Sequence, residues 1–170
     1  MRFLILTTIL ILGFTSQTLA DSVNRYTNSF SVQFGLNGAM QAPQSYGLQF
    51  IPPDLSYSHE LYDDDVINIS TATFYDNIGV KVKDTNFTYR VGQRIDFGLE
   101  LGKYTPYVTL GLGSIRNAHH YQTSLVYGTG FLVRIAKRWL VVNEINFQNV
   151  HYGNSHYDIL NASVGFVYAF

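Results

Sequence analysis

The sequence contains no cysteine, which excludes disulfide frameworks, thiolate metal sites and thiol enzymes. Charged residues are scarce at 14%, and 11 basic residues face 12 acidic ones. A nucleic-acid binder needs a surplus of Lys and Arg to displace counterions from phosphate, so this balance argues against that class. Apolar, aromatic and small residues are abundant instead: 46% are hydrophobic, and there are 13 Tyr, 12 Phe and 14 Gly. The length of 170 residues suits one domain.

The first 20 residues differ from the rest. Arg2 is followed by an apolar run over residues 3–14 and then by small and polar residues up to Ala20. A positive start, an apolar core and a small residue at the exit are typical of a secretory signal peptide. The run has 12 residues, whereas a membrane-spanning helix takes about 20. We therefore expect a signal peptide over residues 1–20 and one domain over residues 21–170, with an uncleaved anchor as the alternative.

Beyond residue 21 no stretch has the period of an amphipathic helix, and the recurring period is two. It is clearest between Phe87 and Leu101, where seven of the eight odd positions are apolar and none of the seven even positions is. Successive side chains of a strand point to opposite faces, so this stretch predicts a strand with one apolar and one polar face. The apolar face comprises Phe87, Tyr89, Val91, Ile95, Phe97, Leu99 and Leu101.

The same alternation predicts strands around residues 30–37, 108–113, 125–135, 139–149 and 160–170, and more weakly over 44–51 and 66–83. The apolar face of the strand at 44–51 consists of Tyr46, Leu48 and Phe50, and that of the strand at 66–83 consists of Ile78, Val80 and Val82. Turn-forming Gly, Asn and Asp residues lie between the strands. Residues 51–65 show the least regular pattern, which fits either a long turn or part of a protruding first loop. The sequence thus predicts eight strands in a single unit.

This pattern fits two kinds of barrel: a soluble lipocalin-like barrel with its apolar face inside, and a membrane barrel with its apolar face in lipid. Ten glycines fall on the polar face, where the narrow lumen of an eight-stranded barrel needs small residues. Aromatic residues gather toward strand ends, as in an interfacial girdle. A closed barrel also satisfies every backbone group within lipid. We therefore predict an all-β fold, an eight-stranded antiparallel up-and-down transmembrane β-barrel with a side-chain-filled lumen. The girdle residues are Tyr104, Trp139, Phe147, Tyr168 and Phe170.

The charges of the polar face are nearly balanced, as an internal network of ion pairs requires once it is sequestered from water. A structural network is favoured over an ion path, because eight strands leave little room for a pore. The predicted lumen network consists of Lys81, Arg90, Arg94, Asp96, Glu100, Arg134 and Glu144.

The chain resembles the outer-membrane β-barrels of Gram-negative bacteria, in particular the OmpA/OmpX/opacity-like group of eight-stranded barrels. The resemblance is carried by residues 102–108 with the following Gly111-Leu112-Gly113, by residues 127–131 leading to Trp139, and by residues 164–170. It implies periplasmic termini, short periplasmic turns and longer extracellular loops. The alternating Phe166, Tyr168 and Phe170 at the C-terminus resemble the signal that the barrel assembly machinery recognises. The resemblance does not imply one activity, because such barrels serve as adhesins, stabilisers, evasion factors and, rarely, lipid-modifying enzymes.

Possible chemistry is confined to the predicted loops. His151, Ser155, His156 and Asp158 contain the residue types of a Ser/His/acid site. Lipid A deacylases of the outer membrane carry a His-X-Ser-Asn element near their end, but the matching serine position here holds Gly153. The adjacent His119 and His120 are poorly placed to chelate one metal, and residues 63–65 lack the ligand spacing of a calcium loop.

We therefore expect a non-enzymatic integral protein of the cell outer membrane, with no catalytic residue, metal or cofactor and with a structural or adhesion-like role. The expected partners are outer-membrane lipid and lipopolysaccharide, the barrel assembly machinery, and a host surface or protein ligand, but no nucleic acid. Loops at residues 38–43, 114–121 and 149–157 are expected to face outward and make these contacts. The alternatives are a lipid A-modifying, deacylase-like enzyme, a narrow porin, and a soluble periplasmic lipocalin.

Overall fold

A computed structural model describes residues 27–39, 49–50, 53–82, 85–117, 120–152 and 155–170. The expected signal peptide lies outside these residues. Within them no helix is long and apolar enough to cross a membrane. The regular structure of the described residues consists of strands: β1 (Asn28–Ala39), β2 (Gln49–Phe50), β3 (Asp54–Asp63), β4 (Ile67–Val82), β5 (Thr85–Leu99), β6 (Tyr104–Asn117), β7 (Tyr121–Arg134), β8 (Trp139–Tyr152) and β9 (Ser155–Ala169).

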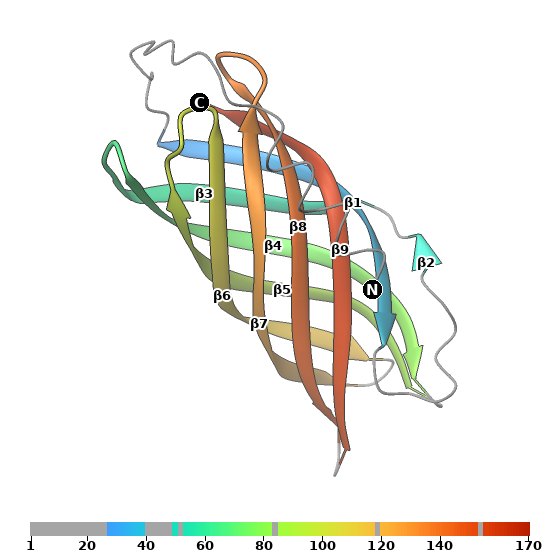
Figure 1. Ribbon diagram of the computed structural model, residues 1–170. Coiled ribbons are helices and arrows are strands. Elements are labelled where there is room, and N and C mark those ends of the chain that lie inside the picture. The colour runs from blue at the N-terminus through green and yellow to red at the C-terminus, as the bar shows by residue number, and fades with distance from the viewer. Residues whose placement is uncertain (1–26, 40–48, 51–52, 83–84, 118–119, 153–154) are drawn as a thin grey trace, which may run out of the picture.

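Eight long strands form a closed antiparallel barrel, as the sequence predicts. Each strand from β3 to β8 pairs with the next one along the chain. The barrel closes through β1, which pairs with β3 on one side and with β9 on the other. The β1 and β9 pairing runs from Ser29 opposite Ala169 to Ala39 opposite Ile159. Figure 1 shows the two strands side by side in the barrel wall.

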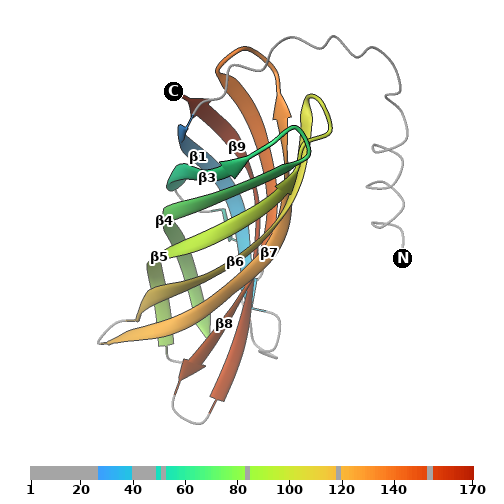
Figure 2. The same ribbon diagram turned by 90° about the vertical axis from the view of Figure 1, so that its left-hand side faces the viewer.

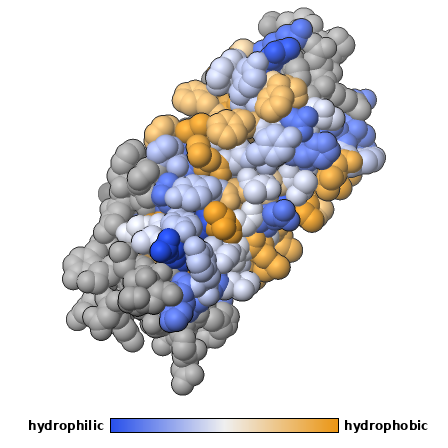
Figure 3. Space-filling model, turned by 180° about the vertical axis from the view of Figure 1, so that it is seen from behind, coloured by the Kyte–Doolittle hydropathy of each residue, from blue (hydrophilic) through white to orange (hydrophobic). Residues whose placement is uncertain are grey.

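The faces of the wall follow the alternation in the sequence. On β6 the side chains of Val108, Leu110 and Leu112 are 55%, 55% and 61% exposed, whereas Thr109 between the first two and Tyr107 just before them are buried. The bulky apolar residues therefore point outward and the polar ones into the lumen. Figure 3 shows hydrophobic side chains spread over the outer wall of one face.

The two ends of the barrel differ. The end that holds Asn28 and Phe170, here called the terminal end, also holds the turns 64–66, 100–103 and 135–138. At the opposite, far end the paired strands almost meet: Val82 pairs with Thr85, and Tyr152 pairs with Ser155. Figure 2 shows the three turns and the C-terminus together at the top of the view. Most of the residues expected in loops at 114–121 and 149–157 therefore belong to strands, because the hairpins extend further than the apolar alternation does.

The second barrel strand differs from the expected one. Of the weak strand at 44–51 the structure describes Gln49 and Phe50, which form a short strand beside β1, and residues 44–48 and 51 lie outside the described residues. The wall is built instead by β3, within the segment that showed the least regular pattern. Leu55 and Tyr57 face outward there, and Ser56 faces the lumen. The polar His59 on the outer face and a bulge between Glu60 and Tyr62 hide this alternation in the sequence.

Two further bulges reverse the predicted facing of apolar side chains. The register of β5 against β6 shifts between Phe87 and Tyr89, and Phe87 is fully buried in the lumen rather than facing outward. The register of β4 against β5 shifts between Asn77 and Val80, and Ile78 is fully buried too. Gly79 lies in this second bulge with a φ of 57°, a left-handed conformation that favours glycine.

Candidate functional site: the barrel lumen

Glycines on the inner wall make room for large side chains in the lumen. A Cβ added to Gly113 would lie 2.7 Å from Cδ of Arg90, and one added to Gly130 would lie 2.6 Å from Cζ of Tyr107. Real Cβ atoms do not approach other atoms this closely. The space above the glycines is therefore occupied by Arg90 and Tyr107, two of the largest side chains in the lumen.

The far-end part of the lumen is filled by apolar side chains. Ile78, Phe87, Ile115, Val126 and Ile159 come from five different strands, and each is 0% exposed. The lumen is therefore closed at this level by a dry apolar layer. The sequence analysis expected polar and charged residues inside and did not predict this layer.

A charged belt lies next to this layer, on the side toward the terminal end, and is centred on Arg94 and Glu144. Their side chains form two parallel hydrogen bonds, from Nη1 to Oε1 at 2.6 Å and from Nη2 to Oε2 at 2.8 Å. The Nε atom of Arg94 lies 3.2 Å from Oδ1 of Asp96. Tyr107 and Asn146 also donate hydrogen bonds to Glu144. Bidentate and charge-assisted bonds of this kind are the strong ones, and they offset the cost of burying both charges.

Arg90 forms the second part of the belt. Its guanidinium pairs with Asp76 and lies over the ring of Phe74, with Cζ 4.5 Å from the ring centroid. With its oxygen turned toward Arg90, the amide of Gln148 accepts hydrogen bonds of 3.3 Å from Nη1 and Nη2. Arg90 is 1% exposed, so these groups replace water around its charge.

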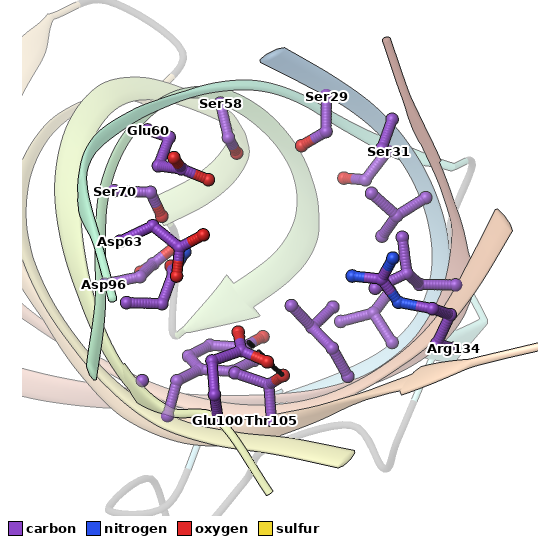
Figure 4. A pocket seen from close by; sticks show the side chains of 18 of the residues that line it. Ser29, Ser31, Ser58, Glu60, Asp63, Ser70, Asp96, Glu100, Thr105 and Arg134 are labelled. Atoms are coloured by element: carbon purple, nitrogen blue, oxygen red, sulfur yellow. Dashed lines mark hydrogen bonds between the residues drawn. The ribbon is translucent and has the colours of Figure 1, made fainter. Parts of the chain in front are cut away.

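The terminal-end part of the lumen is open. It holds a cavity of about 690 Å³, here called the vestibule, with Tyr107 and Arg94 among its lining residues. In Figure 4 Ser58, Ser70 and the carboxyl groups of Glu60, Asp63 and Asp96 lie on one side of this cavity, and Ser31 and Arg134 lie on the opposite side. Leu132, Leu140, Val142 and Val167 form an apolar wall contributed by β7, β8 and β9. The expectation of a side-chain-filled lumen therefore holds for the far-end part and is wrong for the terminal-end part.

Glu100 and Arg134 lie in the vestibule rather than in the charged belt. Thr105 donates to the carboxyl group of Glu100 at 3.2 Å. Burial raises the pKa of Glu100 above its ordinary value, and the bond from Thr105 opposes this rise. Among the described residues the guanidinium of Arg134 forms no ion pair. The structure thus brings Arg90, Arg94, Asp96 and Glu144 into the belt and separates Glu100 and Arg134 from it.

Other predicted residues fall partly outside the described residues. The side chains of Lys81, His151, Ser155 and His156 are among those not described. Asp158 lies on β9 and accepts a hydrogen bond of 2.8 Å from Asn149. Phe166 and Phe170 face outward, and the rings of Tyr168 and Phe170 stack with centroids 6.1 Å apart. Within the described part of the chain no group of three or more His, Asp and Glu residues is placed to hold a metal ion.

The sequence analysis missed Asp54, Asp76 and Tyr107. Asp54 of β3 lies near the charged belt, where its carboxylate accepts from the backbone N–H of Asn77 on β4 at 2.7 Å and from Asn161 on β9 at 3.2 Å. Asp76 and Tyr107 lie at inward positions of their strands. Parity was the available signal for Tyr107, which shares the lumen face with Thr109. Asp76 has the parity of Ile78, Val80 and Val82, whose apolar face was expected to point outward, so the pattern gave no signal for it.

No known protein family matches the sequence, and no curated protein matches it either. Several solved structures share the fold, including the following two. Ail, the attachment invasion locus protein of Yersinia pestis, is 15% identical with a TM-score of 0.58, over 86% of this chain and 100% of that one. Neisserial surface protein A is 13% identical with a TM-score of 0.57, over 85% of this chain and 97% of that one. The chain therefore has the fold of the eight-stranded outer-membrane barrels, which confirms the resemblance at the level of the fold.

Proposed function

We propose that the chain is an integral outer-membrane barrel with a structural or surface-interaction role, that it is not an enzyme, and that its lumen conducts no ions. It reaches the membrane after removal of residues 1–20. The observation that carries the proposal is the division of side chains between the two faces of the wall. The outer face exposes large apolar residues on every long strand, whereas the charged groups of the belt are paired inside. Lipid is the solvent that fits this arrangement.

The two rims of the apolar outer face support a membrane position. At the terminal end the rings of Trp139 and Tyr168 lie 5.0 Å apart, and Arg138 donates to the hydroxyl of Tyr168 at 3.1 Å. Toward the far end Arg116 donates to the hydroxyl of Tyr89 at 3.2 Å, and its guanidinium lies 5.9 Å from the ring centre of Tyr121. Aromatic side chains with polar tips at both edges of an apolar band are typical of membrane barrels.

The far rim suits lipopolysaccharide as a lipid partner. Arg116 is exposed on the outer wall, and among the described residues its interactions are with tyrosines and not with a carboxylate. A guanidinium in this position can pair with the phosphate of a glycolipid in the outer leaflet. A host surface or protein ligand would also be met at the far end.

The C-terminal strand supports recognition by the barrel assembly machinery. Phe166 and Phe170 are 53% and 49% exposed on the outer wall, and Tyr168 lies between them on the same face. These side chains point away from the lumen, and the edge of β9 that pairs with β1 in the closed barrel is open to a partner until closure. The proposed assembly signal therefore consists of Phe166, Tyr168 and Phe170.

Three measurements test this function: the first tests the membrane barrel against the soluble lipocalin, and the other two test the proposed role against the narrow porin and the lipid A-modifying enzyme. The chain purified in detergent should run at two mobilities in SDS gels, with and without boiling, because a closed membrane barrel resists SDS until it is heated. In planar bilayers it should produce no channel steps under conditions in which a general porin does. The acyl composition of lipid A should be the same in cells with and without the gene. Channel steps would overturn the closed lumen, and altered lipid A would overturn the non-enzymatic role.

A further inference from the structure

The outer wall carries a patch of polar side chains within its apolar band. Tyr57 of β3, Thr73 of β4 and Gln93 of β5 lie opposite one another on neighbouring strands, and these three residues are here called the polar patch. All three side chains point outward and are exposed. On β5 the patch is bordered by the exposed apolar residues Val91 and Ile95. A wall that only had to match hydrocarbon would continue these apolar residues through the patch.

Gln93 lies within the apolar band and not at one of its rims. A strand rises about 3.3 Å per residue, so Gln93 is roughly 13 Å along β5 from Tyr89 of the far rim and roughly 20 Å from Leu99, the last residue of the strand. Lipid head groups lie beyond the hydrocarbon layer. At the depth of Gln93 an exposed side chain of an isolated barrel therefore meets only acyl chains.

The hydrogen-bonding capacity of the polar patch is not used within the chain. Among the described residues, neither the amide of Gln93 nor the hydroxyl of Thr73 has a hydrogen-bond partner. Thr71 on the same face of β4 differs, because it donates to the backbone carbonyl of Arg94 at 3.3 Å. Lipid tails neither donate nor accept hydrogen bonds, so an unpartnered amide in hydrocarbon is costly. A protein surface with its own donors and acceptors would remove this cost.

The same patch on a second copy of the chain provides such a surface. An amide has an acceptor oxygen and a donor nitrogen, so two Gln93 side chains can bond to each other across a two-fold axis. A two-fold contact brings identical patches together and requires them to be self-complementary. No residue of the polar patch is charged, so two copies do not repel each other there. The short side chain of Thr73 beside Gln93 also lets the two walls approach closely, as small residues do at contacts within membranes.

We propose that two copies of the chain form a dimer in the membrane through the polar patch of Tyr57, Thr73 and Gln93. The β5 strands of the two copies face each other, and their Gln93 amides pair at the two-fold axis. Each copy keeps its own closed barrel, so the contact leaves the lumen unchanged. This inference rests on the proposed membrane role, because the unpartnered amide is costly in lipid and not in water.

The first experiment measures association in lipid vesicles. Lys137→Cys, in an exposed turn at the terminal end, carries either a donor or an acceptor dye, and the chain has no other cysteine. Energy transfer between the dyes is measured as the ratio of protein to lipid is lowered. We expect transfer above the level of random encounter. Gln93→Leu should weaken the association by roughly tenfold, which corresponds to about 1.4 kcal/mol, the size expected for a side-chain hydrogen bond within a membrane.

Asn143→Leu is the matched control for this experiment. Asn143 also belongs to the outer face, on β8, but its amide is half-buried between Phe131 and Val164 on the neighbouring strands. The substitution removes an amide from the lipid-facing wall outside the polar patch. It should leave the association unchanged.

A second experiment locates the contact. Spin labels are attached to Val91→Cys on β5 or to Val164→Cys on β9, and the distance between the labels of two copies is measured in vesicles. These strands lie on opposite sides of the barrel, because three strands separate them in either direction around the wall. The labels at residue 91 should therefore be markedly closer together than those at residue 164.

Folding and membrane insertion are established first for each variant, by the two gel mobilities and by flotation with the vesicles. An unlabelled wild-type chain that fails these two measurements contradicts the membrane role itself. A folded, inserted chain without transfer above random encounter would overturn the dimer and leave the membrane role intact. Unchanged association in Gln93→Leu, an equal loss in Asn143→Leu, or a shorter distance at residue 164 would overturn the assignment of the contact to the polar patch.

Discussion

Glu144 receives more hydrogen bonds than any other carboxylate of the charged belt that the structure describes. Its two oxygens accept from both terminal nitrogens of Arg94, from Tyr107 and from Asn146. The three partners come from β5, β6 and β8, so a single side chain joins distant parts of the wall. The stability of the lumen therefore depends strongly on this residue.

Replacing Glu144 by Gln should destabilise the barrel markedly. The substitution removes a charge and leaves the buried Arg94 with Asp96 alone, and breaking a buried pair in this way costs about 3–5 kcal/mol. Denaturant unfolding of the chain in lipid vesicles measures the free energy of unfolding. Glu100→Gln is the control, because Glu100 is half-buried and forms no ion pair among the described residues, so this variant should lose much less stability than Glu144→Gln. Equal losses of stability in the two variants would contradict the role assigned to Glu144.

Single residues also show where sequence reasoning reached its limit. The parity of Arg94 and Glu144 placed both in the lumen, yet their pairing joins positions 50 residues apart and depends on the stagger of β5 against β8. The sequence does contain a signal for the apolar wall of the vestibule, but the sequence analysis did not use it. At residues 131–133, 139–142 and 166–170 the alternation gives way to continuous apolar runs, so both faces of the strand are apolar there.

Bulges decide which side chains an individual strand sends into the lumen. A strand with unbroken alternation would place Phe87 on the same outward face as Phe97, as the sequence pattern predicts. The register shift between Phe87 and Tyr89 turns Phe87 inward, where it is fully buried, whereas Phe97 is 46% exposed. A bulge inserts one residue without changing the composition of the strand, so the hydrophobic pattern alone does not reveal it. The same reason explains the unpredicted burial of Ile78.

Two substitutions of the same residue type on β5 test this reversal. Phe87→Ala should leave a cavity in the apolar layer and cost about 3–5 kcal/mol. Phe97→Ala should cost clearly less, because lipid can fill the space that the ring leaves on the outer wall. The measurement is again denaturant unfolding in vesicles of one lipid composition. If Phe97→Ala proved the more damaging variant, β5 would lack the bulge and Phe87 would face lipid.

The whole molecule has two unlike ends, and this asymmetry bears on its function. The far end is sealed by an apolar layer, whereas the terminal end opens into the vestibule. The sequence predicted the barrel and its inside-out character because these depend on the period of two, which is local. The difference between the ends arises from side chains of eight strands meeting at one level of the lumen, and no single stretch of sequence contains it.

The orientation of the barrel can be measured because the chain contains no cysteine to give background. His120 precedes β7 at the far end, and Lys137 lies in the turn between β7 and β8 at the terminal end, and both side chains are exposed. With periplasmic termini, His120→Cys should react with a membrane-impermeant maleimide in intact cells. Lys137→Cys should react only after the outer membrane has been permeabilised. The reverse pattern would place the vestibule at the cell surface and the sealed end in the periplasm.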